Sequence, residues 1–172
     1  MLIDSSYFTR GSRRIYNATA GTGSGMPNPA AAEVNAAIES FVAELQEEYL
    51  RLMLGAEVGN KVHCYLVCKD EDESTPKVDT YEAVCDQLKE SFADYVFFDI
   101  LRETQTTATV TGLVRLKCAN EYITPLAKQT RTWNRMVERN RDFMQWTLSD
   151  NCPLKGICIT NEMLTKVNYF NL

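Results

Sequence analysis

The sequence has few of the features by which catalytic, membrane-bound or secreted proteins are recognised. No apolar run approaches the ~18 residues that a membrane-spanning helix needs, and the first residues lack the apolar stretch of a secretory signal. There is one histidine, and no GxSxG, HExxH, phosphate-loop or dinucleotide-binding motif occurs. We therefore expect a soluble protein made in a cytoplasm, with no catalytic site, no cofactor and no membrane partner.

Metal-binding signatures are also scarce, because none of the six cysteines forms a CxxC pair. Cys64 and Cys68 are one helical turn apart with His63 alongside, but a zinc site would need two more ligands. In a reducing compartment disulfides are not expected. The pattern favours ordinary buried thiols over a metal site.

What is present is an ordinary globular composition. The 172 residues are 45% hydrophobic and 24% charged, which is enough for one domain with its own core. The net charge of -5 argues against general nucleic-acid affinity, although local basic faces remain possible.

The rest of the chain is arranged around a long helix predicted between Asn28 and Gly55. Asn28 and Pro29 supply an N-cap followed by a proline at the first helical position, and Gly55 suits a helix stop. Apolar residues recur at helical spacing between these ends. The predicted inward positions are Val34, Ile38, Phe41, Leu45, Tyr49 and Leu52.

Helical spacing recurs later in the chain. A capping-box-like start at Asp79 opens a second long helix towards Leu101, and Thr124-Pro125 opens a third that reaches about Leu148. The segment 56–69 fits either a short helix or a strand, and we favour the helix. The fold class is therefore mainly α, a bundle of three long helices plus a short one within residues 28–150.

A threonine-rich segment interrupts this bundle at about residues 104–118. Thr106 to Thr111 and Leu113 to Cys118 are rich in β-branched residues around Gly112, and predict an inserted extended or β-hairpin tip, or a long loop. Such segments are commonly exposed and available for pairing with another chain.

Both ends of the chain carry apolar residues without a helical pattern. Residues 1–27 comprise apolar pairs and a Gly-rich linker, and residues 151–172 end on aromatics. We interpret both as extended docking arms, which could dock on their own domain or on a neighbour. On this interpretation residues 1–20 or 160–172 can be deleted without unfolding the bundle.

A basic stripe runs along the third long helix, formed by Lys128, Arg131, Arg135 and Arg139. Three interpretations compete for it: a solvated face, a partner for the acidic face of the first helix, or a surface facing nucleic acid.

The order of several short motifs resembles a known family. An N-terminal YFxxGxRxI arm starts at Tyr7, an EYLRxxLG helix end at Glu48, and a YVFFDIL helix end at Tyr95. An extended TxxGxV segment follows at Thr109, then a TWNxMVxxN helix from Thr132 and a VNYFxL terminus. This set is similar to the head–tail connector (adaptor) proteins of tailed bacteriophages, of the type found in phages and prophages of gut Bacteroidota-like hosts.

The resemblance implies a structural virion protein rather than an enzyme. It implies a homo-oligomeric ring matching the twelvefold symmetry of the portal, between the portal protein and a tail or stopper protein, with genome DNA passing through. The basic stripe would line this channel or contact the next subunit. The implied tip residues are Thr109, Gly112 and Val114. The implied docking residues are Tyr7, Phe8, Ile15, Val167, Tyr169, Phe170 and Leu172.

A second hypothesis belongs to another class. It is a small cytoplasmic binding or regulatory protein with a thiol or metal site, in which His63, Cys64 and Cys68 would matter. Metal analysis and mass measurement would separate the two hypotheses.

Overall fold

The computed structural model describes residues 1–19, 29–72, 74–103, 106–109, 112–115 and 126–168, with only the backbone described for the two strands. It is mainly helical, with helices α1 (Pro29–Leu54), α2 (Ala56–Glu71), α3 (Asp79–Glu103) and α4 (Leu126–Thr147). Three short 3-10 turns accompany them: η1 (Ser5–Phe8), η2 (Gly11–Arg13) and η3 (Asn161–Leu164). None of the helices in these ranges is both long and apolar enough to cross a membrane.

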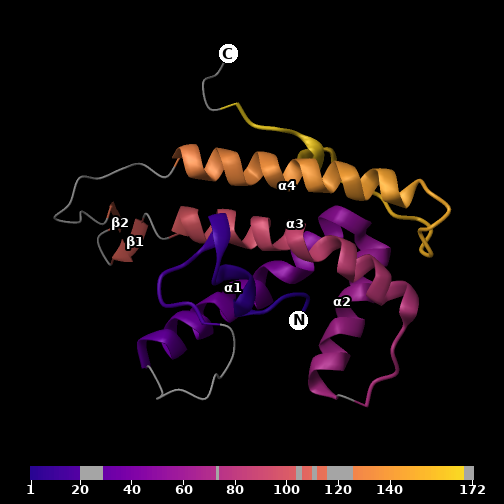
Figure 1. Ribbon diagram of the computed structural model, residues 1–172, viewed down its shortest axis with the longest axis horizontal. Helices are drawn as coiled ribbons and strands as arrows, with labels where there is room; N and C mark the ends of the chain where they lie inside the picture. Colours follow the sequence, from indigo (N-terminus) through magenta and orange to yellow (C-terminus); the bar gives the residue numbers. More distant parts are fainter. Residues whose placement is uncertain (20–28, 73, 104–105, 110–111, 116–125, 169–172) are drawn as a thin grey trace.

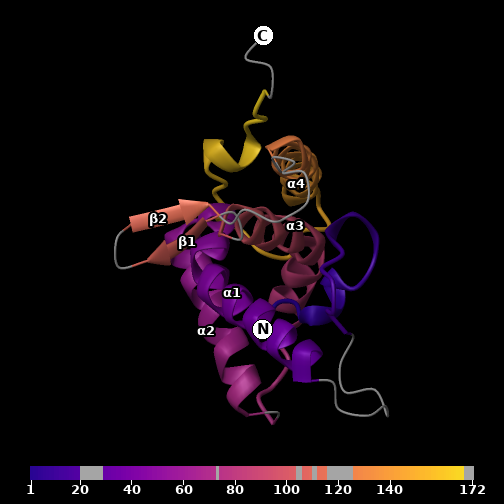
Figure 2. The same cartoon turned by 90° about the vertical axis from the view of Figure 1, so that its left-hand side faces the viewer.

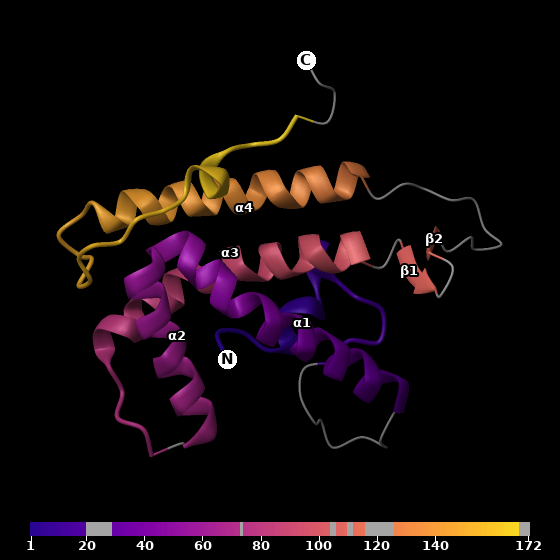
Figure 3. The same cartoon turned by 180° about the vertical axis from the view of Figure 1, so that it is seen from behind.

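The three long helices are stacked with α3 between α4 and α1, and the shorter α2 packs on α1 at one end. Helices α3 and α4 run side by side along the long axis of the molecule, and α1 crosses the opposite side of α3 (Figure 1). The same order is seen from behind (Figure 3). The structure is compatible with the expected bundle of three long helices plus a short one.

Helix α1 buries more of its circumference than its spacing predicts. Ile38 and Tyr49 are buried as expected, whereas Val34, Phe41 and Leu45 are only partly buried. The fully enclosed positions lie one residue further on, because α1 is covered by both α2 and α3. These additional buried residues are Val42, Gln46, Leu50 and Met53.

The ambiguous segment 56–69 is helical, as favoured, and turns back along α1. Gly55 has φ +83°, a backbone conformation that favours glycine, and it ends α1 at the expected residue. Gly59 lies so close to α1 that a Cβ atom there would be 2.7 Å from the carbonyl oxygen of Leu50. The two helices therefore pack with their backbones nearly in contact.

Two short strands follow α3 in the threonine-rich segment. Strand β1 (Thr106–Thr109) pairs antiparallel with β2 (Gly112–Arg115), with Thr107 opposite Val114 and Thr109 opposite Gly112. The pair lies beyond the end of α3, to one side of the helices (Figures 1 and 2). The other residues of the tip expected at 104–118, namely 104–105, 110–111 and 116–118, lie outside the described ones.

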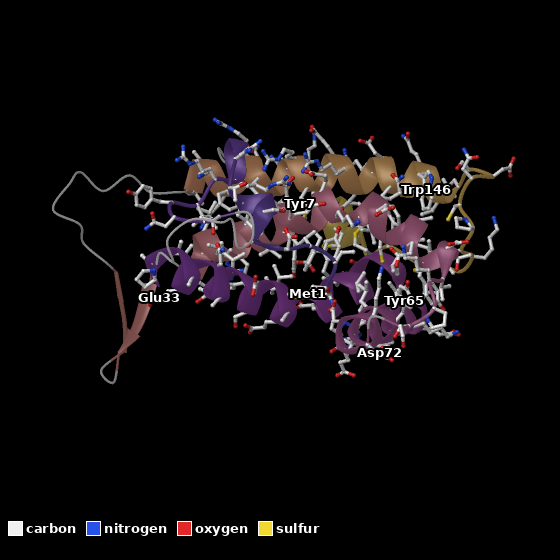
Figure 4. The ribbon with its side chains drawn as sticks, turned by 60° about the horizontal axis from the view of Figure 1, so that its bottom comes forward. Met1, Tyr7, Glu33, Tyr65, Asp72 and Trp146 are labelled. Carbon is white, nitrogen blue, oxygen red and sulfur yellow. The ribbon has the colours of Figure 1, made fainter. Side chains whose placement is uncertain are left out.

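The N-terminal arm predicted at residues 1–27 docks on its own domain over its described part, residues 1–19, rather than on a neighbour. Leu2, Ile3 and Phe8 are buried within the main hydrophobic cluster. The Leu2 N–H donates to Gln46 Oε1 of α1 at 2.6 Å, which ties the first residues to the bundle. Met1 and Tyr7 lie against the helices in Figure 4. Turn η1 contacts both α1 and α3, so the burial of these residues depends on tertiary contacts that no local sequence pattern reveals.

The C-terminal arm docks on its own domain in the same way up to residue 168. The N–H groups of Cys158 and Thr160 donate to the carbonyls of Leu54 and Leu52, at 3.3 and 2.9 Å. Met163 is buried in the core, where Asn140 of α4 donates to its carbonyl at 2.8 Å. Residues 152–168 are therefore part of the subunit rather than a free arm.

Candidate functional site

The most concentrated group of charges in the described residues is a set of arginines around a buried carboxylate of α3. Asp94 is 0% exposed and accepts hydrogen bonds from three guanidinium groups. We call this set, with Glu90 one turn earlier, the arginine–carboxylate cluster. Its members are Arg13, Glu90, Asp94, Arg135 and Arg139.

The three arginines reach Asp94 from two different parts of the chain. Arg135 Nε donates to Asp94 Oδ2 at 2.9 Å, and Arg139 Nη1 donates to the same oxygen at 2.5 Å, both from α4. Arg13, from η2, donates to Asp94 Oδ1 at 3.2 Å and to Glu90 Oε2 at 2.6 Å. The cluster therefore fastens the N-terminal segment and α4 to the same face of α3.

A carboxylate buried as deeply as that of Asp94 is stable in its charged form only if its partners compensate the full cost of removing it from water. Its desolvation is opposed by charge-assisted hydrogen bonds, and removing one partner of such a group typically costs ~3–5 kcal/mol. The neighbouring Ser12 hydroxyl also contacts Arg135. The geometry is that of an internal ionic clamp rather than of a site open to substrate.

This cluster decides the role of half the predicted basic stripe. Arg135 and Arg139 pair with Asp94 of α3, so of the three interpretations the pairing with the acidic face of the first helix does not apply to these two residues. Lys128 lies over the Phe97 ring, with Nζ 4.7 Å from the ring centroid. Arg131 is exposed and makes no ion pair within the described part of the chain.

The predicted docking residues separate into three groups. Phe8 is 0% exposed in its own core and cannot also dock on a neighbour, so that assignment is wrong. Tyr7 and Ile15 are half-buried against the same core, whereas Val167 is 45% exposed. The remaining predicted docking residues at the end of the chain, Tyr169, Phe170 and Leu172, lie outside the described residues.

Val167 is nevertheless fixed by its backbone. Its N–H donates to Asn134 Oδ1 and its carbonyl accepts from Asn134 Nδ2, each at 2.9 Å. Trp133 Nε1 donates to the Thr165 carbonyl at 2.9 Å. The chain is thus anchored on α4 immediately before its last residues, with the Val167 side chain facing outward.

His63, Cys64 and Cys68, the residues of the thiol or metal hypothesis, are not joined into a site in the structure. Cys64 and Cys68 are exposed on α2, and the His63 Nδ1 atom lies 3.5 Å from Gln46 Nε2. No group of three possible metal ligands occurs in the ranges that the structure describes. Burial raises the pKa of Cys85 to about 12, so this thiol stays protonated. Cys118 lies outside the described residues.

Two open hollows occur on the surface of the described chain. One, of about 390 Å³, lies where α1 meets α2 and is lined by Leu54, Lys61, Tyr81 and Cys158, among others. The other, of about 410 Å³, is lined by η1 and by Arg10, Arg13 and Glu90. The first hollow is lined by Cys158, Glu57 and Lys61, but Lys61 Nζ pairs with Glu57 Oε1 at 2.7 Å and no hydrogen bond within the described residues joins either group to the thiol. The second hollow holds a single carboxylate, that of Glu90.

Comparison with protein-family models, with curated proteins and with solved structures finds no match for this chain.

Proposed function

We propose that this chain is a structural virion protein of the head–tail connector type, which assembles as a ring between the portal and the tail of a bacteriophage. The observation that carries the proposal is the two-stranded sheet at the end of α3. It lies to one side of the helices, and among the residues that the structure describes each strand pairs only with the other. A two-stranded sheet on its own is marginally stable in water, and its outer edges can each accept another strand.

The order of motifs supports the same function. The resemblance to connector proteins spans most of the sequence, and a strand presented to a neighbouring copy is a known mode of protein association. Because the first 19 residues and residues 152–168 are tied to their own subunit, the docking role passes to β1, β2 and the residues after Val167. An acidic chain also suits a channel to which genome DNA must not adhere.

The proposal is tested by observing the purified full-length protein in solution and by electron microscopy. We expect closed rings at high protein concentration, either alone or with a portal protein. The double variant Thr107→Pro, Val114→Pro removes one backbone N–H from each strand and should abolish ring formation. Thr107→Ala, Val114→Ala is the matched control and should retain it.

Circular dichroism separates a real loss of assembly from misfolding. Helix content by circular dichroism should be the same in both double variants, because β1 and β2 lie outside the bundle. Rings that persist in the proline variant would show that the strands are not the assembly element. A wild-type protein that stays monomeric with or without a portal protein would contradict the connector function itself.

A further inference from the structure

Two groups of charged residues, one mainly basic and one mainly acidic, lie on opposite sides of α3. Glu90 and Asp99 are both acidic residues of this helix, nine positions apart. At about 100° per residue, they project about 180° apart around the helix axis. Glu90 lies among arginines, whereas Asp99 lies among further carboxylates. The two sides of the helix therefore differ in sign of charge.

The side of Glu90 carries an excess of positive charge. Arg13, Arg135 and Arg139 already neutralise the buried Asp94 and the half-exposed Glu90. Arg10 is exposed and lines a hollow together with Arg13 and Glu90. Arg14 is exposed and follows Arg13 in the chain, and Arg131 is exposed one turn from Arg135. These three exposed arginines have no ion pair within the described part of the chain, so their charge is available to a partner. We call Arg10, Arg14 and Arg131, together with the cluster arginines, the basic face.

The side of Asp99 carries an excess of negative charge, which we call the acidic face. Its members come from α1, α3 and η3: Glu44, Glu48, Asp99, Glu103 and Glu162. Burial raises the pKa of Asp99, and the nearby charges of Glu103, Glu44 and Glu48 raise it further against the opposing effect of Arg102. Burial, together with Glu48, Asp99 and Glu162, likewise raises the pKa of Tyr95 to about 12. These carboxylates therefore repel one another, with Arg102 as the neighbouring cation that opposes them.

The two faces point away from each other in space. Figure 2 shows the N-terminal segment, which carries Arg10 and Arg14, on one side of α3, and η3 with β1 and β2 on the other. A contact between opposite faces of identical copies is head-to-tail, and such contacts close into rings when the rotation between copies permits. A twofold dimer would instead need both charges on one shared surface.

We propose that the basic face of one copy docks on the acidic face of the next copy. The inference rests on the proposed ring function and names the two surfaces through which adjacent subunits meet. Complementary charge of this kind selects the partner and its orientation. The acidic face lies on the same side as β1 and β2, so one neighbour can engage both.

A second copy fits these faces better than a nucleic acid does. A nucleic acid would neutralise the basic face alone and would be repelled by the acidic one, in a chain whose net charge is -5. A second copy neutralises both faces in a single type of contact. It also relieves the repulsion among the carboxylates around Asp99.

The experiment is a charge swap on the full-length chain, followed by sedimentation velocity at low and high salt. In the variant Arg10→Glu, Arg14→Glu the basic face becomes acidic, and in Glu44→Lys, Glu48→Lys the acidic face becomes basic. Each variant alone should lose the assembled species that the wild type forms at low salt. Mixing the two variants should restore assembly with equal amounts of each, because every contact again joins opposite charges.

A matched control changes the same number of charges elsewhere. Lys77 and Lys155 are exposed, belong to neither face and make no ion pair in the described residues. Lys77→Glu, Lys155→Glu should assemble like the wild type, and circular dichroism should show all variants folded. The substituted arginines and glutamates are exposed and make no ion pair within the described chain, so folding should be unaffected.

The failure outcomes distinguish this inference from the proposed function. Wild-type rings that persist in both charge-reversed variants would overturn the docking of the two faces while leaving the connector function standing. A wild type that never assembles would overturn both. Duplex DNA binding that is lost in Arg10→Glu, Arg14→Glu, with self-assembly unchanged, would assign the basic face to nucleic acid and overturn the inference.

Discussion

Asp94 is the residue on which the N-terminal segment, α3 and α4 jointly depend. Its carboxylate is fully buried, and the arginines that compensate it come from η2 and α4. A polar side chain in this position stabilises the fold only as long as every partner stays in place. The consequences of changing it therefore extend beyond its own helix.

We predict that Asp94→Asn lowers the free energy of unfolding by ~3–5 kcal/mol, because three guanidinium groups are left without their buried counter-ion. Glu90→Gln is the matched control, since the Glu90 side chain is 52% exposed and its ion pairs should contribute ~1 kcal/mol or less. Urea unfolding followed by circular dichroism measures both. Equal effects in the two variants would show that burial of Asp94 does not govern its contribution.

Asp99 should affect stability in the opposite direction. The pKa of Asp99 is raised in the folded chain, first by burial and then by the neighbouring carboxylates. Its protonated form is thus favoured by folding. This contribution is fully present below the unfolded pKa of 3.8, and is lost as pH rises through the folded pKa.

Asp99→Asn is therefore expected to be more stable than the wild type at neutral pH in the monomeric protein. The difference should shrink as the pH falls towards 3.8, where the wild-type carboxyl becomes neutral as well. Unfolding curves measured on dilute protein across this pH range provide the test. A variant less stable than the wild type at neutral pH would mean that the acidic face is not under repulsion.

At the scale of elements, the packing of α2 on α1 depends on the absence of one side chain. In a helix interior, alanine is ordinarily more favourable than glycine by ~1 kcal/mol. At Gly59, however, a Cβ atom would lie 2.7 Å from the backbone of Leu50, and backbone cannot move aside as a flexible side chain can. The steric clash of a Cβ atom at position 59 should therefore cost more free energy than the higher helix propensity of alanine gains.

We expect Gly59→Ala to destabilise the protein by ~1–3 kcal/mol, the usual range for overpacking a close contact. The neighbouring Asn60 is exposed on the same helix, so Asn60→Ala should be neutral or slightly stabilising. Thermal unfolding of the two variants side by side measures the difference. A stabilised Gly59→Ala protein would indicate that α2 can shift away from α1 at little cost.

The helices could largely be recognised from the sequence, because each signal that defines them is local. Proline and glycine mark α1, and apolar residues recur at helical spacing in all three long helices. The partner of Arg135 and Arg139 could not be recognised in this way. Glu90 and Asp94 precede these arginines by dozens of positions, and only the packing of α3 against α4 brings them together.

For the whole molecule, the N-terminal segment belongs to the folding unit. Leu2, Ile3 and Phe8 are buried, and Arg13 completes the ionic clamp on α3. The expectation that residues 1–20 can be removed without unfolding the bundle is therefore reversed. Deletion of residues 1–13 should strongly destabilise the protein, as a loss of cooperative unfolding in calorimetry would show.

A pair of single substitutions tests this conclusion without truncation. Phe8→Ala should cost ~3–5 kcal/mol, as expected for a fully buried phenylalanine. Tyr16→Ala, in the same segment but with a residue that is 81% exposed, should cost little. A similarly small loss of stability in the Phe8→Ala and Tyr16→Ala variants would show that the N-terminal segment is independent of the helical bundle.

The sequence by itself determined the helical class, the ends of α1 and the break in helix propensity before β1, because these follow from short-range spacing and from proline and glycine. Tertiary structure alone decided that residues 1–19 and 152–168 fold onto their own subunit, and that Arg135 and Arg139 pair with α3. It also decided that opposite charges end on opposite sides of that helix. The physical reason is that burial and charge compensation depend on which surfaces meet in space, and no residue carries that information in its immediate neighbours.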